Sequence, residues 1–323
     1  MSLRVIDRET VRRLLPYEAC IPLMRDAMMA LSAGRTQQLL RQIIDLGEAS
    51  AFGVMPGATP EAFGAKLIGV RPPPADGVQS HQGAVVLFNR ASGDVVAVLH
   101  AGEITAIRTA AASAAATDVL SRADASRVAI LGTGEQAHSH AVAMSKVRPV
   151  SELVIWGRSP ERARVLAERL RRELDVRIAT AASVEAAVAE ADIICTTTAA
   201  ASPILENRWV KGGTHINLAG SSRPGPREID DELVLRARFI ADHREGVLRQ
   251  GAELLHAKAA GLVGDDHVIA EIGEVMAGER PGRTSAAEVT IYKSLGAIVQ
   301  DLAAGWFVYQ AALKEDLGID APF

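Results

Sequence analysis

From Arg127 onward the chain alternates between short apolar runs and longer segments with helical spacing. The apolar runs of strand length read VAILG, LVIWG, DIICTT, THINLAG and FIADH, and the helical segments between them include ERARVLAERLRREL and ASVEAAVAEA. Strands that are apolar along their whole length are typical of a parallel sheet covered by helices on both faces. The alternation therefore predicts an α/β domain built on such a sheet.

The part of the chain before this alternation has a different sequence pattern. Between 39 and 99, the runs QIID, FGAKLIGV, GAVVLF and VVAVLH are short and separated by Gly, Pro, Asn and Asp, which predicts an antiparallel or mixed sheet. An alanine-rich helix is expected over 104–120, and a last helix over 294–317 is expected to pack back on this part. The predicted fold class is α/β, with the alternating domain inserted in a smaller α+β domain. The expected ranges are 121–294 for the inserted domain and 1–120 with 295–323 for the smaller one.

Composition limits the partners of this chain. Its 323 residues include 35 Lys and Arg against 39 Asp and Glu, so the net charge of −4 offers no basic surplus for nucleic acid or an anionic membrane. Hydrophobic residues make up 48%, which indicates a folded chain. Cys20 and Cys195 cannot form a disulfide framework, and neither has neighbours at metal-ligand spacing. No apolar run has the length of a signal-peptide core or a membrane span, so we expect a cytoplasmic protein without a metal.

The sharpest motif follows the first strand of the alternation. In VAILGTGEQAHSHAVA, Gly132, Gly134 and Ala137 form a GxGxxA pattern between an apolar strand and a helix. The glycines permit a tight turn and let backbone N–H groups approach a pyrophosphate, whose charge the helix N-terminus favours. The pattern predicts a dinucleotide-binding loop, with an ordinary glycine-rich turn as the alternative.

The end of the next strand bears on the choice of dinucleotide. A strand that serves NAD usually ends in Asp or Glu, which accepts a hydrogen bond from the ribose 2′-hydroxyl. Here LVIW is followed by Gly157, Arg158 and Ser159, with no carboxylate at the tip. Unless Arg158 is simply a solvated loop residue, it can pair with a 2′-phosphate, so NADPH is expected ahead of NADH. Thr196 and Thr198 follow the fourth strand, either as cofactor contacts or as β-branched residues that end it.

Together with this loop, several further segments resemble the ornithine cyclodeaminase/mu-crystallin family, in order and over nearly the whole chain. The resemblance is nearest to the ketimine reductase branch. It implies a Rossmann domain inserted in a smaller domain, whose strands join those of a second subunit in a homodimeric barrel. The matching segments are GVMPG (53–57), FGAKL (63–67), SHQG (80–83), ITAIRTAAASAAAT (104–117), LGTGEQAHSH, INLAGSSRPGPREID (216–230) and YKSLG (292–296).

The resemblance implies a small amino or imino acid substrate whose carboxylate is held by Arg41, Lys66 and Arg108. Residue chemistry agrees for two of these, because Lys66 lies in an apolar strand and Arg108 in an alanine-rich helix. A cation buried among apolar neighbours is costly unless an anion meets it, and a substrate carboxylate would do so. The alternatives are an ion pair with an Asp or Glu of the chain, or a side chain that reaches outward to solvent.

The resemblance also assigns residues around the cofactor and the substrate. Ser80, His81 and Gln82 are expected near the nicotinamide, unless they only form a polar loop between strands. Leu295 is expected to pack beside the nicotinamide and the substrate, and Lys293 to be a scaffold or phosphate-side residue. The other expected cofactor contacts are Thr109, Gly132, Gly134, Glu135, Gln136, Gly157, Arg158, Ser159, Thr196, Thr198 and Ser222.

Two positions separate this chain from the cyclodeaminases of the family. Those enzymes carry an Asp base before a Pro and a Glu before a Met-Pro pair, where this chain has Ser222 and Gly53. A serine hydroxyl cannot replace a carboxylate as a base at neutral pH without an activating partner. The resemblance therefore implies imine reduction, and not ring closure with loss of ammonia.

The expected reaction is NADPH-dependent reduction of Δ1-pyrroline-2-carboxylate or Δ1-piperideine-2-carboxylate to L-proline or L-pipecolate. Lys66, Arg108 and Ser222 are the expected catalytic residues: the cations orient the substrate, and the proton comes from Lys66 or from a water held by Ser222. Three alternatives stay open. They are an alanine-dehydrogenase-like enzyme for open-chain acids, an ornithine or lysine cyclodeaminase, and a non-catalytic protein that binds a small ligand.

Overall fold

The computed structural model describes residues 2–48, 50–71 and 81–322, and the chain divides into two compact units. The first unit contains Met1–Arg108 and Ala297–Phe323, and the second contains Thr109–Gly296. The first boundary therefore lies inside helix α3 (Ala101–Leu120), before the position near 120 that the sequence suggests. None of the helices in the described ranges has both the length and the hydropathy that a bilayer crossing requires.

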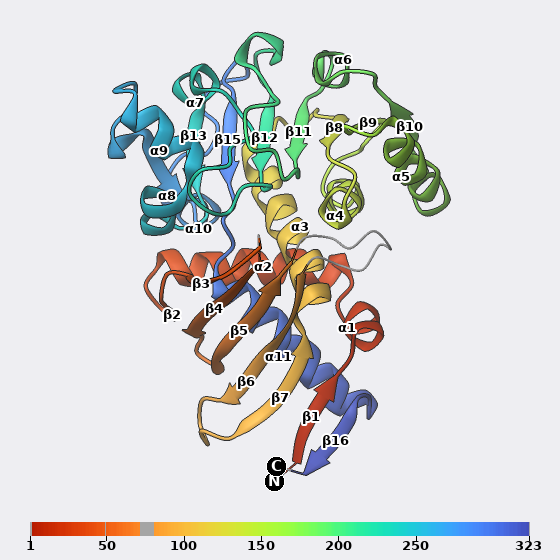
Figure 1. The fold of residues 1–323 in the computed structure, drawn as a ribbon, viewed down its shortest axis with the longest axis vertical. Helices are drawn as coiled ribbons and strands as arrows, with labels where there is room; N and C mark the ends of the chain where they lie inside the picture. The colour runs from red at the N-terminus through yellow and green to blue at the C-terminus, as the bar shows by residue number, and fades with distance from the viewer. Residues whose placement is uncertain (1, 49, 72–80, 323) are drawn as a thin grey trace. The chain divides into compact units, whose positions relative to one another are not determined.

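The first unit is built on one mixed sheet, as predicted for the N-terminal third of the chain (Figure 1). Its strands pair in the order β16-β1-β7-β6-β5-β4-β2, with β3 pairing with β4. All these pairs are antiparallel except β1 with β7. The strands are β1 (Ser2–Ile6), β2 (Gln37–Gln38), β3 (Gln42–Gly47), β4 (Ser50–Ala58), β5 (Ala62–Val70), β6 (His81–Asn89), β7 (Val95–His100) and β16 (Ile319–Pro322).

Helix α11 (Ile298–Glu315) packs against this sheet and against helix α2 (Tyr17–Ser32). The helix buries Ile298, Leu302 and Val308 on one apolar face, and residue 301 lies on that face too. Helix α1 (Arg8–Leu14) begins as the sequence predicts, because the Asp7 side chain accepts a hydrogen bond from Thr10 N. The C-terminal helix therefore returns to the first unit and brings its buried face to strands β4, β5 and β6.

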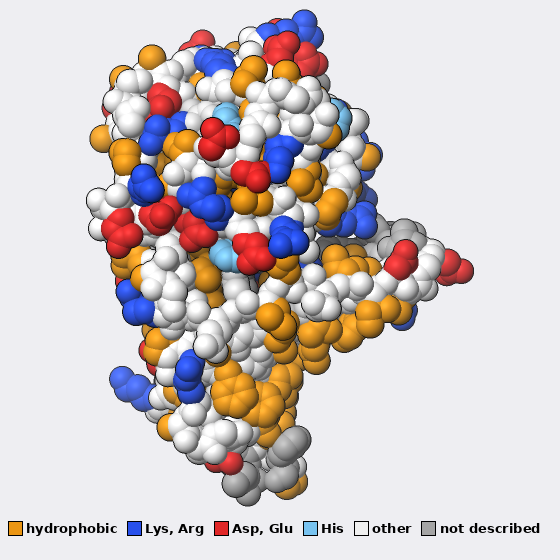
Figure 2. All heavy atoms as spheres, turned by 90° about the vertical axis from the view of Figure 1, so that its left-hand side faces the viewer, with side chains coloured by type: hydrophobic (Ala, Val, Ile, Leu, Met, Phe, Trp, Pro, Cys, Tyr) orange, Lys and Arg blue, Asp and Glu red, His pale blue; other side chains and the backbone are white. Residues whose placement is uncertain are grey.

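The first unit exposes an apolar stripe along and beside strand β3. Leu39, Ile43, Ile44 and Leu46 are between 49% and 64% exposed, and the whole of β3 is exposed. In Figure 2, hydrophobic side chains gather on part of the surface that the view shows. Large apolar side chains exposed together on one strand are typical of a protein interface.

The second unit is built on a parallel sheet in the order β10-β9-β8-β11-β12-β15-β13-β14 (Figure 1). The chain runs outward from β8 through β9 to β10 and then crosses back to β11, so the order reverses between β8 and β11. Ligands bind at such a switch point, outside the carboxyl ends of the strands. The strands are β8 (Arg127–Leu131), β9 (Glu152–Trp156), β10 (Arg177–Thr180), β11 (Ile193–Thr196), β12 (His215–Leu218), β13 (Arg238–Ala241), β14 (Val268–Glu271) and β15 (Thr290–Lys293).

Helices connect these parallel strands, which confirms the α/β domain predicted from the alternation and the Rossmann-type fold that the resemblance implies. Their buried faces supply the alternating apolar positions seen in the sequence; in α5, Ala163, Leu166 and Leu170 are buried. The helices are α4 (Glu135–Met144), α5 (Pro160–Glu173), α6 (Val184–Val188), α7 (Asp231–Arg236), α8 (Arg244–Gln250), α9 (Ala252–Ala259) and α10 (Ile272–Met276), with short 3-10 turns at Asn207–Trp209 and Asp265–His267.

Candidate active site

Lys66 lies in the middle of β5, and its side chain is almost completely buried. Its Nζ is 2.9 Å and 3.0 Å from the two carboxylate oxygens of Asp301, on α11. A third, longer contact of 3.4 Å joins Nζ to Thr105 Oγ1. The buried cation that the sequence singled out is therefore met by a carboxylate of the same chain.

Arg108 reaches the same carboxylate from helix α3. Its Nε donates to Asp301 Oδ1 at 3.0 Å and its Nη1 donates to Gln300 Oε1 at 2.6 Å. Its Nη2 has no partner among the residues that the structure describes. Two buried cations thus share one buried carboxylate, which is one of the alternatives that the sequence left open. The cluster of Lys66, Arg108 and Asp301 keeps one positive charge in excess when Lys66 is protonated.

The charges of this cluster act on one another strongly because all three groups are buried. Burial lowers the pKa of Lys66 to about 7; Asp301 acts against this shift, while Arg108 and Arg41 add to it. Burial by itself would raise the pKa of Asp301, but Arg108 and Lys66 hold it below its usual value. Arg41 lies just before β3 and is partly exposed, so it contributes charge to the cluster from its edge. A small carboxylate suits this excess of positive charge.

The glycine loop of the second unit has the features that a bound pyrophosphate requires. Gly132 follows β8 with a φ of +137°, and a Cβ there would lie 2.5 Å from Thr197 Oγ1, so only glycine fits. Gly134 is the N-cap of α4, and a Cβ there would meet nothing within 4 Å. Glu135 and Gln136 form the first turn of that helix. The loop therefore leaves an open cradle at a helix N-terminus, next to the switch point of the sheet.

The predicted specificity residues lie at the carboxyl end of β9. A Cβ on Gly157 would lie 2.4 Å from Thr133 Cγ2, so this glycine lets β9 pass close to the loop. Ser159 is the N-cap of α5, and its Oγ accepts from Arg162 N at 3.3 Å. Arg158 is exposed, and its guanidinium has no partner in the described part of the chain. A cation at this tip suits a phosphate group.

The hydroxyls of Thr196 and Thr198 donate hydrogen bonds to the buried Glu228, a residue that the sequence analysis missed. Glu228 accepts from Thr196 Oγ1 at 2.7 Å, from Thr198 N and Oγ1 at 2.7 and 2.6 Å, and from Gly220 N at 2.9 Å. Burial raises the pKa of Glu228, and the hydrogen bonds from Thr198 and Thr196 together with the charge of Lys293 oppose the shift. Glu228 thus ties the loop after β11 to the loop after β12, and cofactor contact by the two threonines stays a prediction.

The loop that carries Ser222 is held in place by a hydrogen bond from Lys293. Lys293 Nζ donates to the carbonyl oxygen of Ser221 at 2.7 Å and lies 2.7 Å from Glu253 Oε2, with both charged side chains fully buried. Ser222 itself is half-buried. Lys293 therefore has the bonds of a scaffold residue, and the role of Ser222 as a proton-transfer or cofactor residue stays a prediction.

Leu295 is positioned by another missed carboxylate, Asp242, at the end of β13. Asp242 Oδ2 accepts from Leu295 N and Gly296 N, at 2.7 Å each. Gly296 has a φ of +86°, which permits the turn that this double contact needs. The Leu295 side chain is 8% exposed and packs in the core of the second unit. Its contact with a substrate stays a prediction.

The structure describes some of the remaining predicted residues and leaves others out. Ser80 lies outside the described residues, and so does the side chain of His81, whose backbone begins β6. Gln82 is exposed on β6. Thr109 lies in α3, and its buried hydroxyl has no hydrogen-bond partner among the described residues. Their predicted contacts with the cofactor stay predictions.

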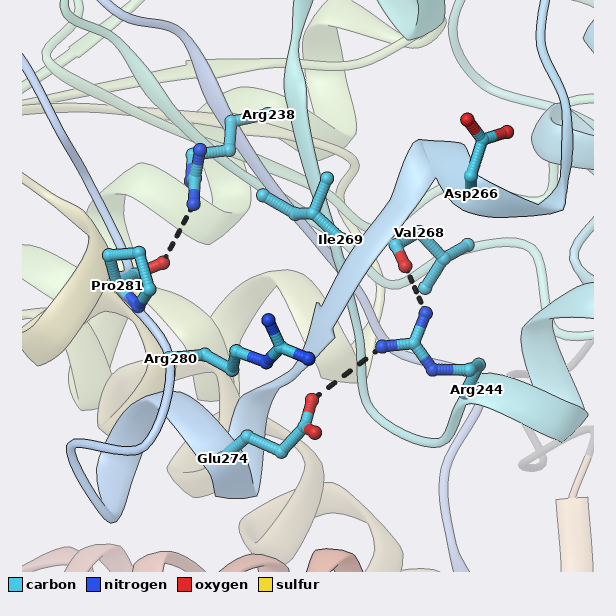
Figure 3. Close-up of a pocket in the computed structure, with 8 residues that line it drawn as sticks. All are labelled: Arg238, Arg244, Asp266, Val268, Ile269, Glu274, Arg280 and Pro281. Atoms are coloured by element: carbon cyan, nitrogen blue, oxygen red, sulfur yellow. Dashed lines mark hydrogen bonds and ion pairs between the residues drawn. The ribbon is translucent and has the colours of Figure 1, made fainter.

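The second unit also contains a cavity of about 630 Å³ beside β13 and β14 (Figure 3). Three arginines line it, but two of them are already bound. Arg238 donates to Pro281 O at 2.9 Å, while Arg244 donates to Val268 O and lies 3.6 Å from Glu274. None of the predicted site residues lines this cavity.

Comparison with known proteins places this site in a family context. The family model described as Ornithine cyclodeaminase/mu-crystallin family matches residues 3–316. The protein named ketimine reductase mu-crystallin from Mus musculus is 38% identical over 282 residues, which cover 86% of each chain. The structure of Thermococcus litoralis Δ1-pyrroline-2-carboxylate reductase in complex with NADH and L-proline has a TM-score of 0.96 at 28% identity, covering 99% of this chain and 100% of that one. An archaeal alanine dehydrogenase dimer with bound NAD has a TM-score of 0.94 at 27% identity and full coverage of both chains.

Proposed function

Because the chain belongs to the ornithine cyclodeaminase/mu-crystallin family, we propose that it is an oxidoreductase that reduces the C=N bond of a cyclic 2-imino acid with NADPH. The proposed substrates are Δ1-pyrroline-2-carboxylate and Δ1-piperideine-2-carboxylate, and the products are L-proline and L-pipecolate. The observation that carries the proposal is the buried cluster of Lys66, Arg108 and Asp301, because its excess positive charge calls for a small carboxylate.

The carboxylate of the imino acid would bind to the two cations of this cluster and to Arg41. Arg108 offers Nη2, which has no partner among the described residues, and Lys66 has an ammonium whose donors can be shared with a second anion. A charged donor and a charged acceptor form a short, strong hydrogen bond in a buried site. Binding at the carboxylate fixes the position of C2 beside it, which converts the reduction into a step between oriented partners.

Protonation of the imine nitrogen is the second task for the chain's own residues. With a pKa of about 7, Lys66 is protonated in about half of the molecules at neutral pH and can release that proton, as a general acid must. A water bound by Ser222 is the other candidate donor. We assign the proton to Lys66, because its buried Nζ shares a cluster with the cation proposed to bind the carboxylate.

The glycine loop of the second unit fits a nicotinamide dinucleotide. Gly132, Gly134 and the first turn of α4 would hold the pyrophosphate, and Arg158 with Ser159 would hold the 2′-phosphate of NADPH. A bound nicotinamide supplies the hydride. The second unit would thus be the cofactor domain, and the first unit the substrate domain.

A cyclodeaminase function is disfavoured by the surroundings of Gly53. A Cβ at this position would lie 3.1 Å from Ile68 Cγ2, so a glutamate there would require the Ile68 side chain to shift. Ser222 supplies no carboxylate where the cyclodeaminases have one. A diamino acid would therefore lack the partner for its second amino group.

We propose that the chain works as a homodimer joined through the apolar stripe on and beside β3. The stripe consists of Leu39, Ile43, Ile44 and Leu46, which a monomer would leave in water. The archaeal alanine dehydrogenase similar to this chain is a dimer. Pairing of two such strands or faces would bury these side chains.

The proposal is tested by following NADPH oxidation with each cyclic imino acid, with NADH in parallel. We expect saturable turnover with at least one of the two rings and a higher kcat/KM with NADPH. Pyruvate with ammonia tests the alanine-dehydrogenase alternative, and ammonia release from ornithine or lysine tests the cyclodeaminase. Turnover in either of those assays without imine reduction would refute the proposal, and binding of an imino acid without turnover would favour a non-catalytic protein.

A further inference from the structure

Asp301 occupies a position that neither a substrate nor a cofactor explains. It is fully buried on the apolar face of α11, and its two oxygens accept from Lys66 Nζ, while Oδ1 also accepts from Arg108 Nε. An anion between the cations of a carboxylate-binding site competes with the substrate for the same donors. Asp301 also fixes the geometry of the two cations that it neutralises, because its hydrogen bonds to both are buried.

We propose that Asp301 is a positioning residue, whose single carboxylate fixes the Lys66 ammonium and the Arg108 guanidinium for the substrate and keeps the proton on Lys66. The inference rests on the proposed function, in which these two cations receive the carboxylate of the imino acid. Asp301 does not itself contact the reacting atoms in this scheme. It acts through the two side chains that do.

The geometry of Arg108 carries the first part of the argument. Asp301 and its neighbour Gln300 hold the guanidinium at Nε and Nη1, at 3.0 and 2.6 Å, so one turn of α11 fixes its plane. Gln300 is held in turn, since its Nε2 lies 3.2 Å from Met28 Sδ. The edge that remains, at Nη2, is the one that a substrate can use. A guanidinium fixed in this way loses little conformational entropy when it binds.

The charges around Lys66 carry the second part. Arg108 and Arg41 both disfavour a proton on Lys66, and burial disfavours it further; Asp301 is the anion that favours it. Cys20 also faces Arg108, but burial raises its pKa to about 12, so its thiol is neutral and adds no charge. Without Asp301, the ammonium would keep two cations nearby, Arg108 and Arg41, and would lose the carboxylate that favours its proton.

The test is Asp301→Asn, with kcat/KM measured from pH 5.5 to 9. In the proposed mechanism kcat/KM falls as the pH rises through the pKa of Lys66, and we call this part of the pH profile its descending limb. Since Asp301 raises the pKa of Lys66, its removal should shift the descending limb to lower pH. With a pKa of about 7 in the unchanged protein, a downward shift of about one pH unit or more makes the loss of kcat/KM about five- to tenfold larger at pH 8 than at pH 6. A folded Asp301→Asn protein whose limb coincides with that of the unchanged chain would overturn the inference.

Two further variants separate charge from packing. Asp301→Glu keeps the anion in a tight buried site, so its limb should stay where it was while KM rises. Gln300→Met removes a bond to Arg108 but no charge, so it should raise KM without moving the limb. If Asp301→Asn does not fold, these two still decide, because a limb that moves in either of them would contradict the assigned roles.

A binding measurement keeps this inference distinct from the proposed function. Calorimetry with pyrrole-2-carboxylate, a planar ring carboxylate, on protein saturated with NADP⁺ gives the pH dependence of Kd without turnover. Asp301→Asn should weaken binding more at pH 8 than at pH 6. If imine turnover is absent but this pattern holds, the proposed reaction fails and the role of Asp301 stands; equal weakening at both pH values would refute that role.

Discussion

Replacing Arg108 by glutamine is expected to weaken substrate binding and, at the same time, to move the pH dependence toward higher pH. The variant is informative because the two effects come from different atoms. Weaker binding comes from the loss of a donor to the substrate carboxylate. The pH shift comes from the loss of a positive charge near Lys66, which lowers the pKa of that lysine in the unchanged protein.

The size of the binding effect follows from how much of the guanidinium is available. Nε and Nη1 already bind Asp301 and Gln300, so the substrate gains at least one hydrogen bond, from Nη2. One hydrogen bond from a charged donor to a carboxylate is worth about 1.5–3 kcal/mol. That free energy corresponds to a rise in KM of about 10- to 150-fold. Asp301 keeps Lys66 as a partner, so the variant is expected to fold.

The sign of the pH effect is fixed by the charges. The active form is taken to be the one with Lys66 protonated, so kcat/KM falls as pH rises through the pKa of Lys66, which is about 7. Removing Arg108 removes a repulsion and raises that pKa, so the descending limb moves up. The Asp301→Asn variant moves it down. Protonation of the free imine substrate also affects the rate, but it does not change between variants, so opposite shifts identify the limb as that of Lys66.

The assay is initial-rate NADPH oxidation at several imino acid concentrations across this pH range, with thermal unfolding as a check on the fold. A KM that changes by less than about threefold would refute the role of Nη2 as a substrate donor. A limb that stays in place or moves down would refute the coupling between Arg108 and Lys66. Either result would separate the cluster from the substrate.

Three further predictions concern the cofactor loop and the dimer. Arg158→Ala should weaken NADPH binding by about tenfold or more and leave NADH within about twofold, because the lost partner is the 2′-phosphate; equal weakening of both, measured by fluorescence titration, would contradict the assignment. Gly134→Val should melt close to the unchanged protein, since a Cβ there meets nothing, but should lose dinucleotide binding in the same titration, because its side chain fills the cradle. Ile44→Asp should convert a dimer into a monomer in light scattering at micromolar concentration, because it places a charge in the apolar stripe; an unchanged mass would refute that interface.

Much of the fold was accessible from the sequence, because the physical signals are local. Continuous apolar runs separated by helical segments reflect strands buried on both faces, and the second unit has them in parallel order. The GxGxxA pattern marks the loop after β8, since the φ of Gly132 excludes other residues. The boundary between the units was less accessible. α3 is one continuous helix, and its alanine-rich sequence does not reveal that the boundary falls at Arg108.

The carboxylates that organise the site were missed, and the reason is instructive. Glu228 and Asp242 each accept several backbone or hydroxyl donors from loops distant in the sequence, so no local pattern reveals them. Asp242 directly follows strand β13, and Glu228 follows a loop of ordinary polar residues, so the local sequence marks neither of them. Only the tertiary structure brings their donors together.

Asp301 differs from these, because its own helix carried a usable signal. Ile298 and Leu302 define a buried face of α11, and residue 301 falls between them at helical spacing. A carboxylate on an apolar face must find a cation, just as Lys66 in an apolar strand and Arg108 in an alanine-rich helix must find an anion. The three residues lie on three different elements, and their opposite charges satisfy one another. Buried charges of opposite sign on different predicted elements can be paired from the amino-acid sequence alone, and this pairing connects Asp301 with Lys66 and Arg108. It also places an anion inside the proposed carboxylate site.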